Sequence, residues 1–399
     1  MYPDGRTISS MRPQAIAMLH ITSKLPHAGT TIFTVMSSLA QECEAVNLSQ
    51  GFPNFDPDPR LRRLVFDHIE RGANQYAPMP GLPALRQRIS EKIARTCPGV
   101  SVDPVSEVTV TAGGTQALFC AFAAFVSPGD EVIIIEPCYD SYRPSIETVG
   151  GVAVPYRLSA PDYRIDWQEV RQLITPRTRM ICINTPCNPT GTALERADLD
   201  ALARLLDGTN IILLSDEVYE HLIYDGAKHA TVLAHPQLRP RALAVYSFGK
   251  TFHNTGWKTG YVVAPEALTV EFRKIHQFNV FCANHPIQAA LADFMEDPTV
   301  YEGLGAFYQQ KRDFFTEKMA ASRLRPLPCR GTYFQLYDYS AVSDEHDLAF
   351  CQRVTREHGV AAIPVSSFYS APNDNKVIRL CFAKTEDVLE EAARRLCGV

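Results

Sequence analysis

The sequence predicts an α/β protein with a mostly parallel seven-stranded sheet in a large domain and a smaller α+β domain after it. Between residues 108 and 265, short runs rich in β-branched residues alternate with helical stretches, a pattern typical of parallel strands joined by helices. Several of these runs are apolar throughout, as strands covered on both faces are. After Pro298 the alternation gives way to a long helical stretch and then to mixed strands and helices.

Each element follows from this pattern in chain order. We expect strands at Val108–Ala112, Glu131–Glu136, Val152–Arg157, Met180–Asn184, Ile211–Ser215, Ala242–Phe248 and Gly260–Val263. Helices between them include Thr115–Phe125, Asp140–Val149 and Asp198–Leu206. Later elements are a helix over Thr299–Ser322, strands at Tyr333–Tyr339, Val360–Pro364 and Lys376–Phe382, and helices at Asp347–His358 and Glu386–Leu396. The predicted domains are 52–297 (large) and 298–399 (small), while 1–51 forms an N-terminal arm and part of the small domain.

Composition and charge exclude several classes of function. Hydrophobic residues make up 46% and charged residues 21%, and the net charge of −5 is spread in mixed signs, which argues against a nucleic acid or an anionic membrane as partner. The longest apolar run, Ala117–Val126, is too short to cross a bilayer, and Met1–Ser10 lacks an apolar signal core, so we expect a cytoplasmic protein. The 11 cysteines form no CxxC pair and the 11 histidines no HxxxH cluster, so we expect no metal.

Polar side chains stand at the carboxyl ends of the predicted strands, where open α/β sheets bind ligands. Lys250 follows an apolar strand, and a desolvated lysine there could be a Schiff-base nucleophile, although a surface lysine on a turn is the alternative. Asp216 follows four aliphatic residues, so it needs a positive partner such as a protonated pyridine nitrogen, with Tyr219 donating to the ring's phenolic oxygen. Otherwise Asp216 caps a helix beginning at Glu217.

Three further segments stand at strand ends. In the loop Asn184–Gly191, the Asn188 amide could bind both a cofactor oxygen and a substrate carboxylate, or the loop is simply a stiff turn. Thr111–Gln116 could bring backbone N–H groups and the Thr115 hydroxyl to an anion, or be a plain helix entry. Tyr139 could stack on a planar cofactor or be a core aromatic. All five segments together supply what one cofactor needs, and this conjunction favours the functional interpretation.

These residues resemble the class I pyridoxal-phosphate aminotransferases of fold type I over nearly the whole chain. The similar stretches are Ser49–Pro53, Asn74–Pro78, Asn184–Gly191, Ser215–His221 and Ser247–Gly256. They are most similar to the branch containing kynurenine aminotransferases, glutamine transaminase K and bacterial methionine aminotransferases. Ser49–Asn54, Ser247–Lys250 and Gly331–Phe334 look particularly like the methionine aminotransferase type.

The resemblance implies pyridoxal 5'-phosphate as cofactor and a homodimer with shared active sites. Lys250 would bond to the cofactor and later move the substrate proton. Asp216 would pair with the ring nitrogen, and Tyr219 and Asn188 would hold the phenolic oxygen. Tyr139 would stack on the ring. The phosphate would be bound by Gly114, Thr115, Gln116, Ser247, Lys258 and Tyr76 of the partner subunit. Arg379, assisted by Asn188 and Gly51, would bind the substrate carboxylate. Without the resemblance, the sequence around Arg379 favours a structural salt bridge of this arginine.

The resemblance also implies a ping-pong transfer of an amino group from an amino acid to a 2-oxo acid. Residues 275–288 contain no arginine, which aspartate-preferring relatives place there, so we expect an apolar, sulfur-containing or aromatic donor: methionine, and also glutamine, phenylalanine or kynurenine. The candidate pocket walls, which could equally be core, are Phe33, Phe52, Phe281, Tyr333 and Phe368. The alternatives are a cysteine-conjugate carbon–sulfur β-lyase and a non-catalytic regulatory module of the same fold. The presence of Lys250 counts against the module.

Overall fold

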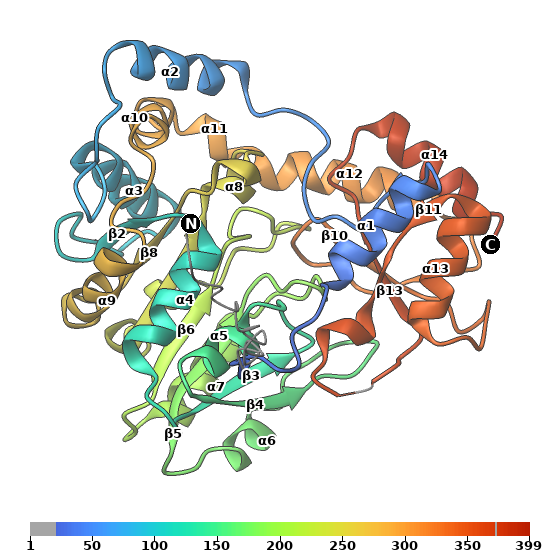
Figure 1. The fold of residues 1–399 in the computed structure, drawn as a ribbon, viewed down its shortest axis with the longest axis horizontal. Coiled ribbons are helices and arrows are strands. Elements are labelled where there is room, and N and C mark those ends of the chain that lie inside the picture. The colour runs from blue at the N-terminus through green and yellow to red at the C-terminus, as the bar shows by residue number, and fades with distance from the viewer. Residues whose placement is uncertain (1–20, 372) are drawn as a thin grey trace, which may run out of the picture.

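A seven-stranded sheet forms the centre of the large domain (Figure 1). The computed structural model describes residues 21–371 and 373–399. In spatial order the strands are β2 (Val108–Thr111), β8 (Gly260–Val263), β7 (Ala242–Ser247), β6 (Ile212–Asp216), β5 (Thr178–Asn184), β3 (Glu131–Glu136) and β4 (Val152–Arg157). All run parallel except β8, which is antiparallel to both neighbours. The predicted mostly parallel sheet is confirmed, and its strand ends lie within about two residues of those expected.

Helices cover both faces of this sheet because its strands are apolar on both sides. All six residues of β3 are buried; Val132 and Ile134 pack into the core on one face, and Ile133 and Ile135 into the core on the other. The first face carries α4 (Gly114–Phe125), α5 (Tyr142–Thr148) and α9 (Glu266–Asn279). The second carries α3 (Pro83–Thr96), α6 (Trp167–Gln172), α7 (Arg196–Leu206) and α10 (His285–Phe294), with α2 (Pro59–Glu70) packed on α10. No helix in the described part of the chain is long and apolar enough to cross a membrane.

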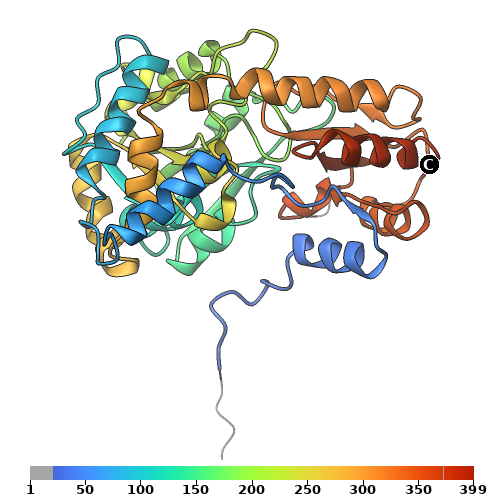
Figure 2. The ribbon, with the colours of Figure 1, turned by 90° about the horizontal axis from the view of Figure 1, so that it is seen from above.

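Within residues 298–371 and 373–399, together with β1 (Val46–Asn47) and the segment before it, the small domain combines two short sheets with three helices. β1 pairs in parallel with β11 (Val360–Ala361). The second sheet has the order β12 (Ile363–Pro364), β13 (Val377–Cys381), β10 (Phe334–Asp338) and β9 (Arg325–Pro326). Its helices are α1 (Ile32–Glu42), α13 (Asp347–His358) and α14 (Glu386–Leu396), and α12 (Leu304–Lys318) runs from the large domain to pack against α14 (Figure 2).

Two predicted elements of the C-terminal part are divided in the structure. The helix expected over Thr299–Ser322 is broken at Gly303 into α11 (Thr299–Glu302) and α12, and α12 ends at Lys318. Because glycine is a poor helix former, interrupting the helix at this position costs little free energy. The strand expected over Val360–Pro364 becomes β11 and β12, which belong to different sheets. Residues 1–20 of the expected N-terminal arm lie outside the described residues.

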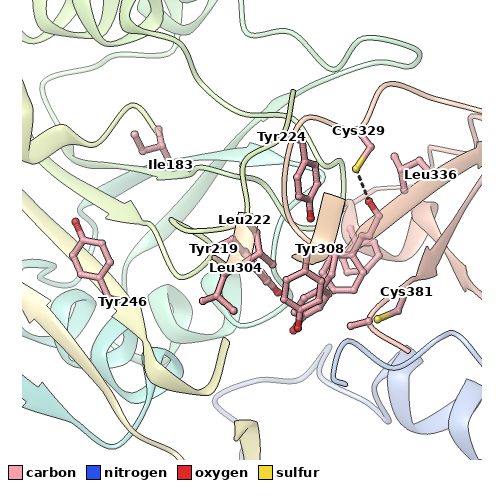
Figure 3. Close-up of a cluster of buried hydrophobic side chains, with 14 of the residues drawn as sticks. Ile183, Tyr219, Leu222, Tyr224, Tyr246, Leu304, Tyr308, Cys329, Leu336 and Cys381 are labelled. Carbon is pink, nitrogen blue, oxygen red and sulfur yellow. Dashed lines mark hydrogen bonds between the residues drawn. The ribbon is translucent and has the colours of Figure 1, made fainter. Parts of the chain in front are cut away.

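A cluster of buried side chains joins the two domains next to the carboxyl end of β6 (Figure 3). Tyr219, Leu222 and Tyr224 come from the segment after β6, Leu304 and Tyr308 from α12, Leu336 from β10, and Cys381 from β13. All of these side chains are buried, so the two domains share one continuous apolar core. This core fixes the small-domain strands against the sheet edge where the predicted site residues lie.

Candidate active site

A cavity of about 240 Å³ lies between the carboxyl ends of the large-domain strands and the small domain. Eleven of the thirteen predicted site residues line it: Gly51, Gly114, Thr115, Tyr139, Asn188, Asp216, Tyr219, Ser247, Lys250, Lys258 and Arg379. Gln116 and Tyr76 do not. A larger cavity of about 320 Å³ shares Asn184 with this one but is lined by none of the predicted residues. The predicted site residues therefore gather at the smaller cavity.

Asp216 is the last residue of β6 and is 3% exposed. The Tyr142 hydroxyl donates to its Oδ2 at 2.6 Å, and the Val218 N–H donates to Oδ1 at 3.4 Å. Burial raises the pKa of Asp216 to about 6, an effect that the Tyr142 hydrogen bond partly offsets. Because turns rather than a helix follow β6, the alternative of a helix cap is wrong. Asp216 is a buried carboxylate, ionised at neutral pH, with no cationic side chain bonded to it among the described residues.

Lys250 sits in the one-turn helix α8 (Phe248–Thr251), directly after β7. Its Nζ donates to the Tyr333 hydroxyl at 2.8 Å and to the Gly51 carbonyl at 3.3 Å. Burial lowers the pKa of this amine to about 8. Lys250 is therefore a cavity residue whose amine can act as a nucleophile or base near neutral pH, and the alternative of a surface lysine on a turn is wrong.

An anion-binding end of the cavity is formed where α4 begins. Gly114 and Thr115 are the first residues of this 12-residue helix, whose free N–H groups favour a phosphate. Gly113 has a φ of +85°, which residues with a Cβ rarely adopt, so glycine permits the turn that leads into α4. Ser247, at the end of β7, completes this side of the cavity.

The side chain of Gln116 turns away from the cavity. Its Oε1 accepts from the Ala112 N–H at 3.1 Å, and its Nε2 lies 3.2 Å from His276 Nδ1 and 3.0 Å from Asn279 Oδ1. The reason is helical geometry, because each residue projects about 100° further round the axis and the third residue of α4 faces α9. The Gln116 side chain therefore does not line the cavity, and the contact of Gln116 with the cofactor stays a prediction that falls to its backbone N–H in the first turn of α4. Its visible role is to tie the start of α4 to α9.

Arg379, in β13, is 1% exposed and is surrounded by aromatic rings. Its guanidinium lies 3.9 Å from the Phe334 ring centroid, 5.1 Å from that of Phe368 and 5.3 Å from that of Phe33. Nη1 donates to Asn188 Oδ1 at 2.6 Å and Nη2 to the Ser49 carbonyl at 2.9 Å. Burial lowers the pKa of Arg379 to about 10, so the side chain remains a cation at neutral pH.

No carboxylate forms an ion pair with Arg379, and its Nε–H has no partner, among the described residues. The structural salt bridge considered from sequence is therefore wrong. A buried cation with an unused N–H is costly unless an anionic ligand completes it. The guanidinium therefore has the properties of a carboxylate-binding group.

Asn188, Tyr139 and Tyr219 are held by local contacts. The Asn188 N–H donates to Asn184 Oδ1 at 2.8 Å, and Asn184 Nδ2 donates to the Asp216 carbonyl at 2.8 Å, which fixes the loop after β5 against β6. The Tyr139 hydroxyl lies 3.1 Å from the Thr115 hydroxyl. The Tyr219 ring is buried and meets the Tyr333 ring edge-to-face at 5.3 Å.

Sequence reasoning missed two residues that contact the site, Tyr142 and Tyr333. Tyr142 was visible only as a residue of a helix, and Tyr333 only as a candidate pocket wall or core residue. In the structure the Tyr142 hydroxyl bonds Asp216, and the Tyr333 hydroxyl bonds both Lys250 and the Gly51 carbonyl. A weak signal did exist, since Tyr142 lies near a strand end, where the other site residues are found.

The described residues fit pyridoxal phosphate. The cavity holds an amine for the aldehyde, a buried carboxylate for the ring nitrogen and an anion-binding helix end for the phosphate, while the unpaired Arg379 Nε–H is left for a substrate carboxylate. Tyr76 lies apart from this cavity in its own chain: its side chain is 82% exposed and meets the Phe281 ring at 5.3 Å.

A fold and a cavity of this kind fit an enzyme that handles amino acids with a carbonyl cofactor. The chain belongs to the class I and II aminotransferase family, whose model matches residues 44–396. Enzymes of this family depend on pyridoxal phosphate, and the predicted family and enzyme class are confirmed.

Known relatives cover nearly the whole chain. A methionine aminotransferase from Escherichia coli (strain K12) is 53% identical over 375 residues, which cover 94% of this chain and 97% of that protein. A solved E. coli structure, described as having a methionine aminotransferase function, superposes with a TM-score of 0.94 at 52% identity, covering 96% of this chain and all of that one. Kynurenine–oxoglutarate transaminase 1 of Mus musculus is 35% identical over 396 residues, covering 90% and 93% of the two chains. The fold-type-I architecture is thereby confirmed.

Proposed function

We propose that this aminotransferase binds pyridoxal phosphate in the 240 Å³ cavity and takes the amino group from methionine or a similar apolar, sulfur-containing or aromatic amino acid, which it passes to a 2-oxo acid. The observation that carries the proposal is the meeting of Lys250, Asp216 and Arg379 in one cavity, although they come from three separate parts of the chain. When bound, the cofactor supplies an electron sink for the bond that breaks at the substrate Cα.

The pKa of each of these residues suits its proposed role. The Lys250 amine, with a pKa of about 8, can accept the Cα proton and return it near neutral pH. The Asp216 carboxylate is ionised above about pH 6 and can keep a bound ring nitrogen protonated. Arg379 stays cationic and can orient the substrate through its carboxylate. Gly114, Thr115, Ser247 and Lys258 are proposed to hold the phosphate.

The cavity walls support an apolar donor. Among the described lining residues the only basic side chains are Lys250, Lys258 and Arg379, and each is already assigned to the cofactor or the α-carboxylate. The remaining lining includes Phe33, Leu118, Val218 and Phe334, which would contact a substrate through apolar surface. The 53% identity to a methionine aminotransferase adds support for a methionine-like donor.

A homodimer with shared sites is proposed from the surface next to Tyr76. Tyr76 is 82% exposed and Phe278 is 88% exposed, and Phe281 at 41% lies against Tyr76. Exposed aromatic side chains gathered in this way are typical of protein–protein contacts. We propose that a second copy covers them, and that Tyr76 of the partner subunit reaches the phosphate end of the cavity.

An absorption spectrum of the purified protein tests the proposal, recorded before and after adding methionine. We expect a visible band from the lysine-bound cofactor that methionine abolishes, with release of the matching 2-oxo acid. Lys250→Ala should lose the band and the turnover, whereas Lys274→Ala, which removes an exposed lysine paired with Glu271 at 2.7 Å, should keep both. A band that no apolar, sulfur-containing or aromatic amino acid alters would overturn the donor assignment. Full turnover in Lys250→Ala would overturn the site.

A further inference from the structure

Tyr333 occupies an unusual place at the edge of the site. Its side chain is fully buried, and its hydroxyl donates to the Gly51 carbonyl at 2.7 Å while accepting from Lys250 Nζ at 2.8 Å. Lys250 also donates to the same Gly51 carbonyl at 3.3 Å. The three groups come from segments far apart in the chain, and together they form a closed triangle of hydrogen bonds around the Lys250 amine.

The direction of each hydrogen bond follows from counting donors. A tyrosine hydroxyl has one O–H, and the Gly51 carbonyl can only accept, so the Tyr333 proton points to Gly51. The Lys250 amine must therefore donate to Tyr333. A neutral amine has two N–H bonds and one lone pair, and the two acceptor oxygens, which are 2.7 Å apart, lie on the same side of Nζ and take N–H donation there.

The lone pair of the amine nitrogen takes a position that is not directed at these two oxygens. Tyr333 does not line the cavity, whereas Lys250 and Gly51 do, so the Tyr333 contact lies on the side of Nζ that faces away from the empty space. This arrangement leaves the cavity side of Nζ open to the lone pair. When Lys250 is protonated, its third N–H occupies the same position, so the proton it gains or gives is exchanged in that direction.

We propose that Tyr333 is a positioning residue, which with the Gly51 carbonyl holds the free Lys250 amine so that its lone pair points into the cavity where the substrate is proposed to bind. The proposal rests on the proposed function of Lys250 as the base. A neighbouring side chain shows that packing alone does not require a paired hydroxyl. The ring of Tyr308 lies 5.7 Å from that of Tyr333 in the same buried cluster, yet the Tyr308 hydroxyl has no partner among the described residues (Figure 3).

Tyr333→Phe is therefore the test and Tyr308→Phe its matched control, since each removes one buried hydroxyl from the same cluster. In the cofactor-free protein, competitive labelling with acetic anhydride and peptide mass spectrometry reports the pKa and reactivity of the Lys250 amine, with Lys274 as an internal standard. An acceptor stabilises an ammonium more than a neutral amine, so we expect the Lys250 pKa to fall by about half to one unit in Tyr333→Phe. In Tyr308→Phe it should stay unchanged.

In the loaded enzyme, the Tyr333→Phe variant should lose about tenfold or more in kcat for methionine. The KM should change little because Arg379 and Asn188 are untouched. The isotope effect with α-deuterated methionine should rise, because proton transfer from Cα becomes slower relative to the other steps. A structural role alone would not move the isotope effect or the labelling profile.

The outcomes separate the two proposals. Equal labelling profiles and equal kcat values for the Tyr333→Phe and Tyr308→Phe variants, with turnover still lost in Lys250→Ala, would overturn only the role of Tyr333. Turnover retained in Lys250→Ala would overturn the proposed function itself. A lowered Lys250 pKa together with a reduced kcat and a raised isotope effect, confined to Tyr333→Phe, would support the positioning role.

Discussion

Replacing Asp216 by asparagine should make the cofactor-free protein more stable at neutral pH, although it should destroy the site. Burial raises the pKa of Asp216 from 3.8 to about 6, so ionising this carboxyl costs more in the folded than in the unfolded chain. The contribution of a group with a raised folded pKa is fully present below the unfolded pKa and is lost as pH rises through the folded pKa. The wild-type protein therefore loses stability between about pH 4 and pH 6 on account of this residue.

The size of the effect follows from the pKa difference. About two pKa units correspond to about 3 kcal/mol of unfolding free energy lost at neutral pH, an upper figure. About half of this loss is already reached at pH 5, so the part that appears between pH 5 and pH 7.5 is about 1.5 kcal/mol. An asparagine carries no charge, and its carbonyl oxygen can still accept from the Tyr142 hydroxyl, now 2.6 Å from Oδ2. Loss of the 3.4 Å contact from the Val218 N–H should reduce the gain only slightly.

Urea denaturation of the cofactor-free protein at pH 5 and pH 7.5 measures the effect. We expect the unfolding free energy of Asp216→Asn, relative to that of wild type, to be about 1.5 kcal/mol higher at pH 7.5 than at pH 5. Asp162→Asn, which changes an exposed aspartate, should follow wild type at both values. A stability difference that does not change with pH would refute the reasoning. Adding pyridoxal phosphate should reverse the order, because only wild type offers the ring nitrogen a carboxylate.

Three further perturbations test the same site. Arg379→Lys should lower kcat/KM for methionine about a hundredfold or more, because a lysine cannot make a bidentate contact to a carboxylate. Steady-state kinetics measure kcat/KM, and a loss under about threefold would contradict this role of Arg379. Tyr142→Phe should raise the pKa of Asp216 by about one unit or more, because the carboxylate loses the hydrogen bond from the Tyr142 hydroxyl. Carbon-13 NMR of labelled aspartate in the cofactor-free protein measures this pKa. In wild type, kcat should rise with pH through about 8 as the Lys250 amine loses its proton, and a pH-independent kcat would argue against Lys250 as base.

Much of the fold could be predicted from the sequence because it rests on short-range patterns. The apolar runs of β3 and β6 are buried on both faces, and a residue such as Asp216 or Lys250 just after such a run must lie at a sheet edge. The points at which two predicted elements are divided were harder to predict from the sequence. Gly303 divides a helix and Ala362 separates two strands of different sheets, and both depend on which distant segments pack there.

The sequence by itself determined the large sheet, the order of its strands along the chain and eleven of the residues that line the cavity. Only the tertiary structure decided which groups bond to them. Tyr142 and Asp216 are 74 residues apart, Lys250 and Tyr333 are 83 apart, and Gln116 faces His276 across 160 residues. Strand formation depends on neighbouring residues, whereas a hydrogen bond depends on where two distant side chains meet after packing, and no local pattern encodes that meeting.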